Sequence, residues 1–119
     1  GLSAQRWNQI PQALLRGDAA VFDKWPIARV IDALLKVCHD ALVRTLQPES
    51  VSHASLFFPG WRGDTLPLSA LEQWRAQLLR VWRHADHPWQ EPLLLESLVA
   101  QAQSALTAKP VATVSPVAV

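Results

Sequence analysis

The chain contains no methionine and no tyrosine, and its only cysteine is Cys38. A single cysteine excludes an intramolecular disulfide, which fits a reducing compartment, and we expect a cytoplasmic protein. No apolar run approaches the ~20 residues that span a bilayer, and the N-terminus lacks the charged and apolar regions of a secretion signal. The formal net charge is only +1, so there is neither a strong basic field for nucleic acid nor an acidic tail. We therefore expect no membrane partner.

What is present is a large apolar fraction. Half of the 119 residues are hydrophobic and six are tryptophan, which carries much buried area in one side chain and suits the core of a small domain. This length allows one domain with a core but no second catalytic domain. Because Gly1 is followed directly by helix-like sequence with no initiator methionine, we expect the chain to be a piece of a longer protein.

Apolar residues recur at intervals of three and four almost throughout, and strand patterns are nearly absent. The pattern predicts five helices, which cover residues 3–16 (or 8–16), 18–24, 26–46, 69–85 and 90–108. Gly17 is expected to end the first helix and Asp18 to cap the second. Ser69 and Glu72 form a predicted capping box at the start of the fourth. We therefore expect an all-α fold, a single compact bundle of five to six helices.

The helix over 26–46 has an apolar arc of about half its circumference, running as far as Leu46, and is expected to lie at the centre of the bundle. Its opposite, polar arc contains Arg29, Asp32, Lys36, His39 and Asp40. The predicted buried stripe of the fourth helix is Leu71, Trp74, Leu78, Val81, Trp82 and Ala85. The predicted apolar face of the fifth helix consists of Leu94, Leu95, Leu98, Val99, Ala102, Ala105 and Leu106.

Residues 47–66 form a long irregular loop, of a length that is unusual in a compact domain unless it is functional or packed down. Its segment 56–61 is too apolar to extend into water and is expected to lie against the bundle. Residues 109–119 contain two prolines and many β-branched residues, which predicts a non-helical tail. The predicted organisation is a helical domain over 1–108 followed by this tail.

Recognisable catalytic motifs are missing: the chain has no glycine-rich phosphate loop, no Gly-x-Ser-x-Gly and no Cys-x-x-Cys. His84, Asp86 and His87 straddle a helix end without a further ligand nearby, so a polar helix terminus is favoured over a metal site. Cys38 and His39 point about 100° apart on a helix, and Cys38 is predicted to be a buried, inert thiol. We expect no catalytic residue, no cofactor, no metal and no small-molecule substrate.

One group of residues departs from a simple core pattern. Leu79 falls outside the apolar stripe of the fourth helix, between Arg75 and Arg83 at four-residue spacing, with Arg80 alongside. The simplest interpretation is a solvated face with one exposed leucine. A subunit contact is the alternative, because interfaces enrich arginine beside an apolar anchor. Val43, off the apolar arc of its helix, is a second candidate contact.

Six motifs occur in a characteristic order along the chain. They are Gly17-Asp18, Trp25-Pro26, Cys-His-Asp-Ala-Leu (38–42), Phe-Phe-Pro (57–59), His-Pro-Trp (87–89) and Leu-Leu-Leu-Glu-Ser-Leu (93–98). In this order they resemble the carboxy-terminal collar domain of the bacterial DNA polymerase III delta-prime subunit. The resemblance covers about residues 3–108 and is strongest over 26–46 and 84–106.

The resemblance implies a structural role in DNA replication. In that family the collar packs with the equivalent domains of delta and of three gamma/tau subunits into a ring that holds the pentameric clamp loader together. Motions of other domains, driven by ATP, then open the sliding clamp. The implied partners are the gamma/tau and delta subunits, with no direct DNA contact from this domain. The zinc module, the ATPase-like module and the arginine finger of the full subunit have no counterpart in these residues. Delta and gamma/tau carry analogous collars, so the motifs do not separate these siblings fully.

Two further hypotheses belong to other functional classes. A small helical DNA-binding module would use Arg75, Arg80, Arg83 and Trp61, and its affinity would fall steeply with salt. The near-neutral net charge disfavours it. A small helical enzyme would be centred on the two histidines and the aspartate of 84–87, and it would need further ligands or a convergent pocket.

Overall fold

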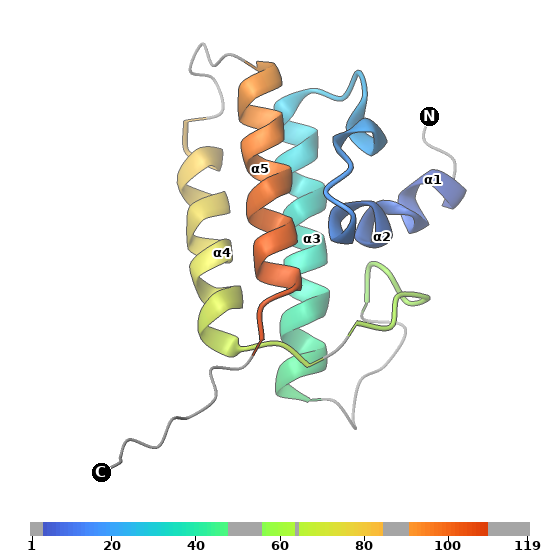
Figure 1. Cartoon of the computed structure of the whole chain (residues 1–119), viewed down its shortest axis with the longest axis vertical. Coiled ribbons are helices and arrows are strands. Elements are labelled where there is room, and N and C mark those ends of the chain that lie inside the picture. The colour runs from blue at the N-terminus through green and yellow to red at the C-terminus, as the bar shows by residue number, and fades with distance from the viewer. Residues whose placement is uncertain (1–3, 48–55, 64, 85–90, 110–119) are drawn as a thin grey trace.

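The computed structural model describes residues 4–47, 56–63, 65–84 and 91–109, and within them every regular element is a helix (Figure 1). In chain order the elements are α1 (Ala4–Asn8), α2 (Ile10–Leu15), the 3-10 helix η1 (Ala19–Phe22), α3 (Ile27–Leu46), α4 (Leu68–Trp82) and α5 (Glu91–Leu106). The all-α bundle is therefore confirmed, and the described residues between α3 and α4, at 47, 56–63 and 65–67, form no helix or strand. The predicted tail lies outside the described residues beyond Lys109.

Three long helices lie side by side, and α4 runs antiparallel to both α3 and α5 (Figure 1). The short elements α1, α2 and η1 lie on the side of the bundle away from α4, where α2 packs against α5. Helix α3 carries more buried residues than any other described element, as its wide apolar arc predicts, whereas α5 is the helix that packs against α2, η1, α3 and α4.

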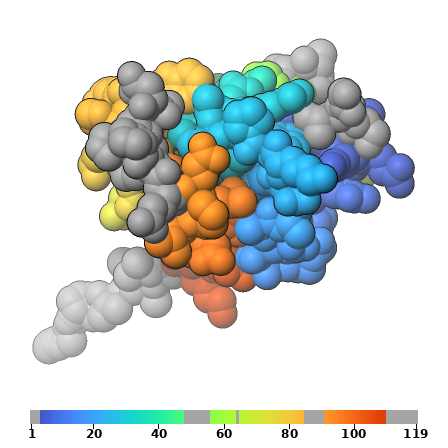
Figure 2. Space-filling model, turned by 90° about the horizontal axis from the view of Figure 1, so that it is seen from above, coloured from blue at the N-terminus to red at the C-terminus, as the bar shows by residue number. Residues whose placement is uncertain are grey.

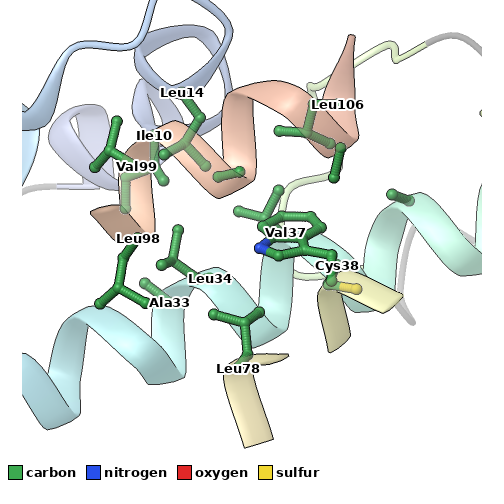
Figure 3. Close-up of a cluster of buried hydrophobic side chains, with 14 of the residues drawn as sticks. Ile10, Leu14, Ala33, Leu34, Val37, Cys38, Leu78, Leu98, Val99 and Leu106 are labelled. Carbon is green, nitrogen blue, oxygen red and sulfur yellow. The ribbon is translucent and has the colours of Figure 1, made fainter. Parts of the chain in front are cut away.

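The core is formed where α2, α3, α4 and α5 meet (Figure 3). Side chains that converge there include Ile10 and Leu14 of α2, Leu34 and Val37 of α3, Leu78 of α4, and Leu98, Val99 and Leu106 of α5. Burial of such side chains, at about 25 cal/mol per Å² of apolar surface, is the main force that holds the helices together.

The turn between α2 and η1 follows the predicted signals. Gly17 has a φ of +68°, a conformation that suits glycine, and its N–H donates to the Leu14 carbonyl at 3.0 Å. Asp18 then accepts a hydrogen bond from the Ala20 N–H at 3.0 Å, which caps η1. The element that follows is a single 3-10 turn ending at Phe22, shorter than the helix predicted over 18–24.

The region predicted as one helix over 3–16 or 8–16 contains two helices, with an interruption at Gln9. The later predicted start is close to that of α2, and Pro11 lies in its first turn, where its missing N–H costs nothing. The predicted capping of the fourth helix was wrong. Helix α4 begins at Leu68 after Pro67, and no side chain caps it, so the predicted capping box does not form. Since the helix starts one residue early, Ser69 already lies inside the first turn and cannot act as the cap.

Three predicted burials also differ from the structure. Trp82 and Leu46 were assigned to apolar faces, but they are 45% and 60% exposed. Each lies in the last turn of its helix, where the neighbouring helices no longer cover it. Asp40 was assigned to the polar arc of α3, yet it is completely buried, because the connection at 56–61 folds over it. Ala85 lies outside the described residues.

Candidate functional site

The residues predicted as a subunit contact lie on two helices. Arg75 and Arg80 are exposed on α4, Arg83 is exposed at its C-terminal cap, and Leu79 is half-buried. Val43 is half-buried on α3. Leu79 and Val43 are therefore neither core residues nor fully solvated, which leaves part of each side chain available for a partner.

The structure does not bring Val43 together with Leu79. The Cys38 thiol lies 3.6 Å from the Leu71 carbonyl oxygen, which fixes how the antiparallel α3 and α4 are aligned. Val43 lies five residues beyond Cys38, and Leu79 lies eight residues beyond Leu71 in the opposite direction. At a rise of 1.5 Å per residue the two side chains are about 20 Å apart along the bundle. They belong to opposite ends of the molecule.

Sequence reasoning missed the more exposed apolar side chains at these ends. Leu46 and Leu68 lie where α3 ends and α4 begins, and we call them the α3–α4 end. Trp82 and Leu93 lie where α4 ends and α5 begins, and we call them the α4–α5 end, which faces the viewer in Figure 2. Leu93, at 61% exposure, had a signal in the sequence, because three consecutive leucines on a helix cannot all face one side.

A buried carboxylate holds the connection between α3 and α4 in place. Asp40 accepts hydrogen bonds from the backbone N–H groups of Phe57 at 3.0 Å and Phe58 at 2.6 Å. The Phe57 carbonyl accepts from the Trp7 indole at 3.0 Å, and the Phe58 carbonyl accepts from Arg44 at 3.3 Å. The prediction that segment 56–61 lies against the bundle is thus confirmed, and Asp40 is the residue that anchors it.

Aromatic rings and cations complete this anchor. The rings of Trp7 and Phe58 stack with centroids 4.7 Å apart. The Lys36 ammonium lies 5.7 Å from the Trp7 ring and 5.4 Å from the Phe57 ring, within the range of cation–π attraction. His39 meets Phe57 edge to face. These contacts join α1, α3 and the connection to one another, so the cluster stabilises the fold.

Trp61 is part of the same packing and not of an open surface. It is only 7% exposed, and the Arg44 guanidinium lies 5.8 Å from its ring centroid. A base could stack on it only after the connection had moved. The predicted DNA-binding surface that combined Trp61 with the α4 arginines therefore lacks its stacking platform.

The structure also separates Cys38 from His39. Cys38 is completely buried, and burial raises the pKa of its thiol to about 12, an effect that Arg75 only partly offsets. His39 Nδ1 lies 3.1 Å from the Asp40 carboxylate. The predicted burial of the thiol is confirmed, and burial disfavours the thiolate that nucleophilic attack requires.

Cys38 therefore makes stability fall at alkaline pH. Its pKa rises from an ordinary value of 9.0 to about 12 in the folded chain, so the unfolded chain releases the proton first. The stabilisation that Cys38 contributes is complete below pH 9 and is lost as the pH rises towards 12. We expect urea midpoints to fall faster between pH 9 and 11 for the native chain than for Cys38→Ala. Parallel curves for the two proteins would contradict this account.

The histidine cluster is only partly described. His84 is exposed at the end of α4, whereas Asp86 and His87 lie outside the described residues. Among the residues that are described, no three His, Cys, Asp or Glu side chains stand close enough to hold a metal ion. In the same part of the chain, no helix has the length and apolar character needed to cross a membrane.

Comparison of the chain with protein-family models, with curated proteins and with solved structures finds no match.

Proposed function

We propose that this chain is a subunit-assembly domain of a replication clamp loader, of the delta-prime collar type, which binds gamma/tau and delta subunits. Two lines of argument support the proposal. The order of motifs from Gly17-Asp18 to the leucine-rich segment of α5 resembles that collar. The all-α bundle is the architecture that such a domain requires.

The observation that carries the proposal is the exposure of large apolar side chains at both ends of the bundle. Leu46 and Leu68 face water at one end, and Trp82 and Leu93 at the other. Tryptophan, and arginine beside it, are the residue types that dominate binding energy at interfaces, and exposed Arg83 follows Trp82 directly. Apolar surface of this kind is stabilised when a partner covers it.

Two separate contact regions suit a subunit inside a ring. Such a subunit meets two different neighbours and must present a different surface to each. In this chain the α3–α4 end and the α4–α5 end are the ends of one packed bundle. A rigid core between them would fix the spacing of the two neighbours.

Size-exclusion chromatography with light scattering tests this function. The chain mixed with purified gamma/tau and delta subunits at micromolar concentration is expected to elute as a stoichiometric complex. Trp82→Glu and Leu93→Glu should weaken the complex at least about thirtyfold each, the effect of losing an interface hot spot. Leu79→Glu and Val43→Glu, at half-buried positions, should have smaller effects.

A matched control is Ala20→Glu, an exposed position on η1 across the bundle from α4. It should leave the complex intact. Equal elution of Ala20→Glu, Trp82→Glu and the native chain would contradict a role for the α4–α5 end. Failure of the native chain to bind either subunit would contradict assembly by this domain.

A further inference from the structure

A pocket lies where α1, the end of α2 and η1 meet, on the side of the bundle away from α4 (Figure 1). Its volume is about 390 Å³, within the range of about 300–1,000 Å³ that is usual for small-ligand pockets. Ala13, which is only 2% exposed, lines it, so the pocket reaches down to a buried residue of α2. Its polar walls are Gln5, Arg6, Gln9, Arg16 and Asp18.

These polar walls have more hydrogen-bond donors than the protein itself uses. Gln5, Gln9 and Arg16 are exposed, and their side chains make no hydrogen bond or ion pair within the described part of the chain. Arginine carries several N–H donors in a fixed fork, and each glutamine adds an amide NH₂ group. Donors gathered around one pocket without protein acceptors suit the oxygen atoms of a ligand.

The pocket also carries an excess of positive charge. Arg6 and Arg16 both line it, and Asp18 is its only carboxylate. One oxygen of Asp18 accepts the Ala20 N–H at 3.0 Å, and the carboxylate makes no ion pair with Arg16. Two like charges beside one pocket repel each other, and an anion placed between them replaces that repulsion by attraction.

We propose that this pocket binds a compact oxyanion, namely a carboxylate or phosphate group of a small ligand. The planar fork of arginine donates two parallel hydrogen bonds to the oxygens of either group, which are among the stronger hydrogen bonds in proteins. None of the walls belongs to the α3–α4 end or the α4–α5 end. The site therefore goes beyond the proposed assembly function and does not depend on it.

An adjoining pocket limits the ligand to a compact anion. It shares Arg6 and Ala20 with the first pocket, and its other walls include the carboxylates of Asp23 and Glu96. These two negative charges would repel a polyanion that extended past Arg6, such as the phosphate backbone of a nucleic acid. A single carboxylate or phosphate group beside Arg16 avoids that repulsion.

Nuclear magnetic resonance titration of the full chain at constant ionic strength tests the proposal, with inorganic phosphate and acetate as separate probes. We expect saturable shifts of the Arg16 Nε–H and the Gln9 side-chain amide at millimolar concentration of the preferred anion. Tighter binding of phosphate would assign a phosphate group, and tighter binding of acetate a carboxylate. Arg16→Gln should weaken binding at least about tenfold, the effect of losing a charge-assisted hydrogen bond.

Arg80→Gln is the matched control, because it removes the same charge from an exposed position on α4 outside the pocket. Ala20→Glu places a carboxylate at the wall and should abolish anion binding while leaving subunit assembly intact, so the two proposals fail separately. Shifts that do not saturate with either anion, or equal weakening by Arg16→Gln and Arg80→Gln, would overturn the proposal. So would a short oligonucleotide that shifts the Arg16 signal at lower concentration than phosphate or acetate does.

Discussion

Replacement of Asp40 by alanine is expected to lower the free energy of unfolding by about 3 kcal/mol. The carboxylate is completely buried and accepts two backbone hydrogen bonds, from Phe57 and Phe58. Its removal leaves the buried Phe58 N–H and the part-buried Phe57 N–H without an acceptor, at about 1–3 kcal/mol each, with some recovery as water reaches Phe57. For a domain of this size the change lowers Tm by roughly 10–20 °C. Urea unfolding followed by circular dichroism measures it.

Two variants distinguish the loss of the carboxylate from a general effect of mutation on stability. Asp40→Asn keeps one acceptor oxygen and should cost about half as much as Asp40→Ala. Asp32→Ala removes the partner of Lys36 in a half-exposed pair on the same helix and should cost under about 1 kcal/mol. If Asp40→Ala were no more destabilising than Asp32→Ala, the anchoring role of Asp40 would be refuted.

Trp74→Ala is expected to have the largest effect, a loss of about 4 kcal/mol of stability. The side chain is 1% exposed and is the largest among the fully buried residues described. It lies on the face of α4 that packs against α3 and α5, so truncation removes transfer energy and leaves a cavity that the helices cannot close. Since total stability for a domain of this kind is about 5–15 kcal/mol, the variant should be close to unfolding at 37 °C.

The matched control is Trp82→Ala, eight residues along the same helix. Trp82 is 45% exposed, so its truncation should cost about 1 kcal/mol or less. Trp74→Phe should fall between the two, because the Trp74 indole N–H has no hydrogen-bond partner among the described residues and only volume is lost. Equal destabilisation by Trp74→Ala and Trp82→Ala would mean that α4 does not pack on the bundle as described.

Much of the fold could be predicted from the sequence, because the spacing of apolar residues that defines a helix is a local property of the chain. The three-to-four spacing of apolar residues identified α3, α4 and α5 and most of their buried positions, such as Leu71 and Leu98. Glycine and aspartate at 17 and 18 marked a helix end and a cap through their own backbone and side-chain preferences.

The errors arose where burial depends on a distant segment. Asp40 belongs to a polar arc by spacing, and only the segment at 56–61, folded back across α3, makes it a buried anchor. Trp82 and Leu46 continue apolar stripes, but a stripe does not show where the neighbouring helix stops covering it. The stacking of Trp7 on Phe58 was equally unpredictable, because the two residues lie about 50 positions apart in the chain.

The candidate interface was predictable only in part, for the same reason. Leu79 and Val43 stood out because they leave the apolar stripe of their own helix. Because α3 and α4 run in opposite directions, the two side chains lie about 20 Å apart. The apolar pattern of one helix alone cannot predict that separation. The exposure of Trp82 and Leu93 could be predicted only with knowledge of where α4 ends and α5 begins.

Hydrogen–deuterium exchange tests the central claim, that the ends of this bundle contact neighbouring subunits, most directly. The chain would be compared alone and in the presence of saturating gamma/tau and delta subunits. We predict added protection in peptides that cover 79–84 and 91–95, and in those that cover 43–47 and 65–69, with little change over α2. Unchanged exchange at both ends, or protection confined to α1 and α2, would contradict the account.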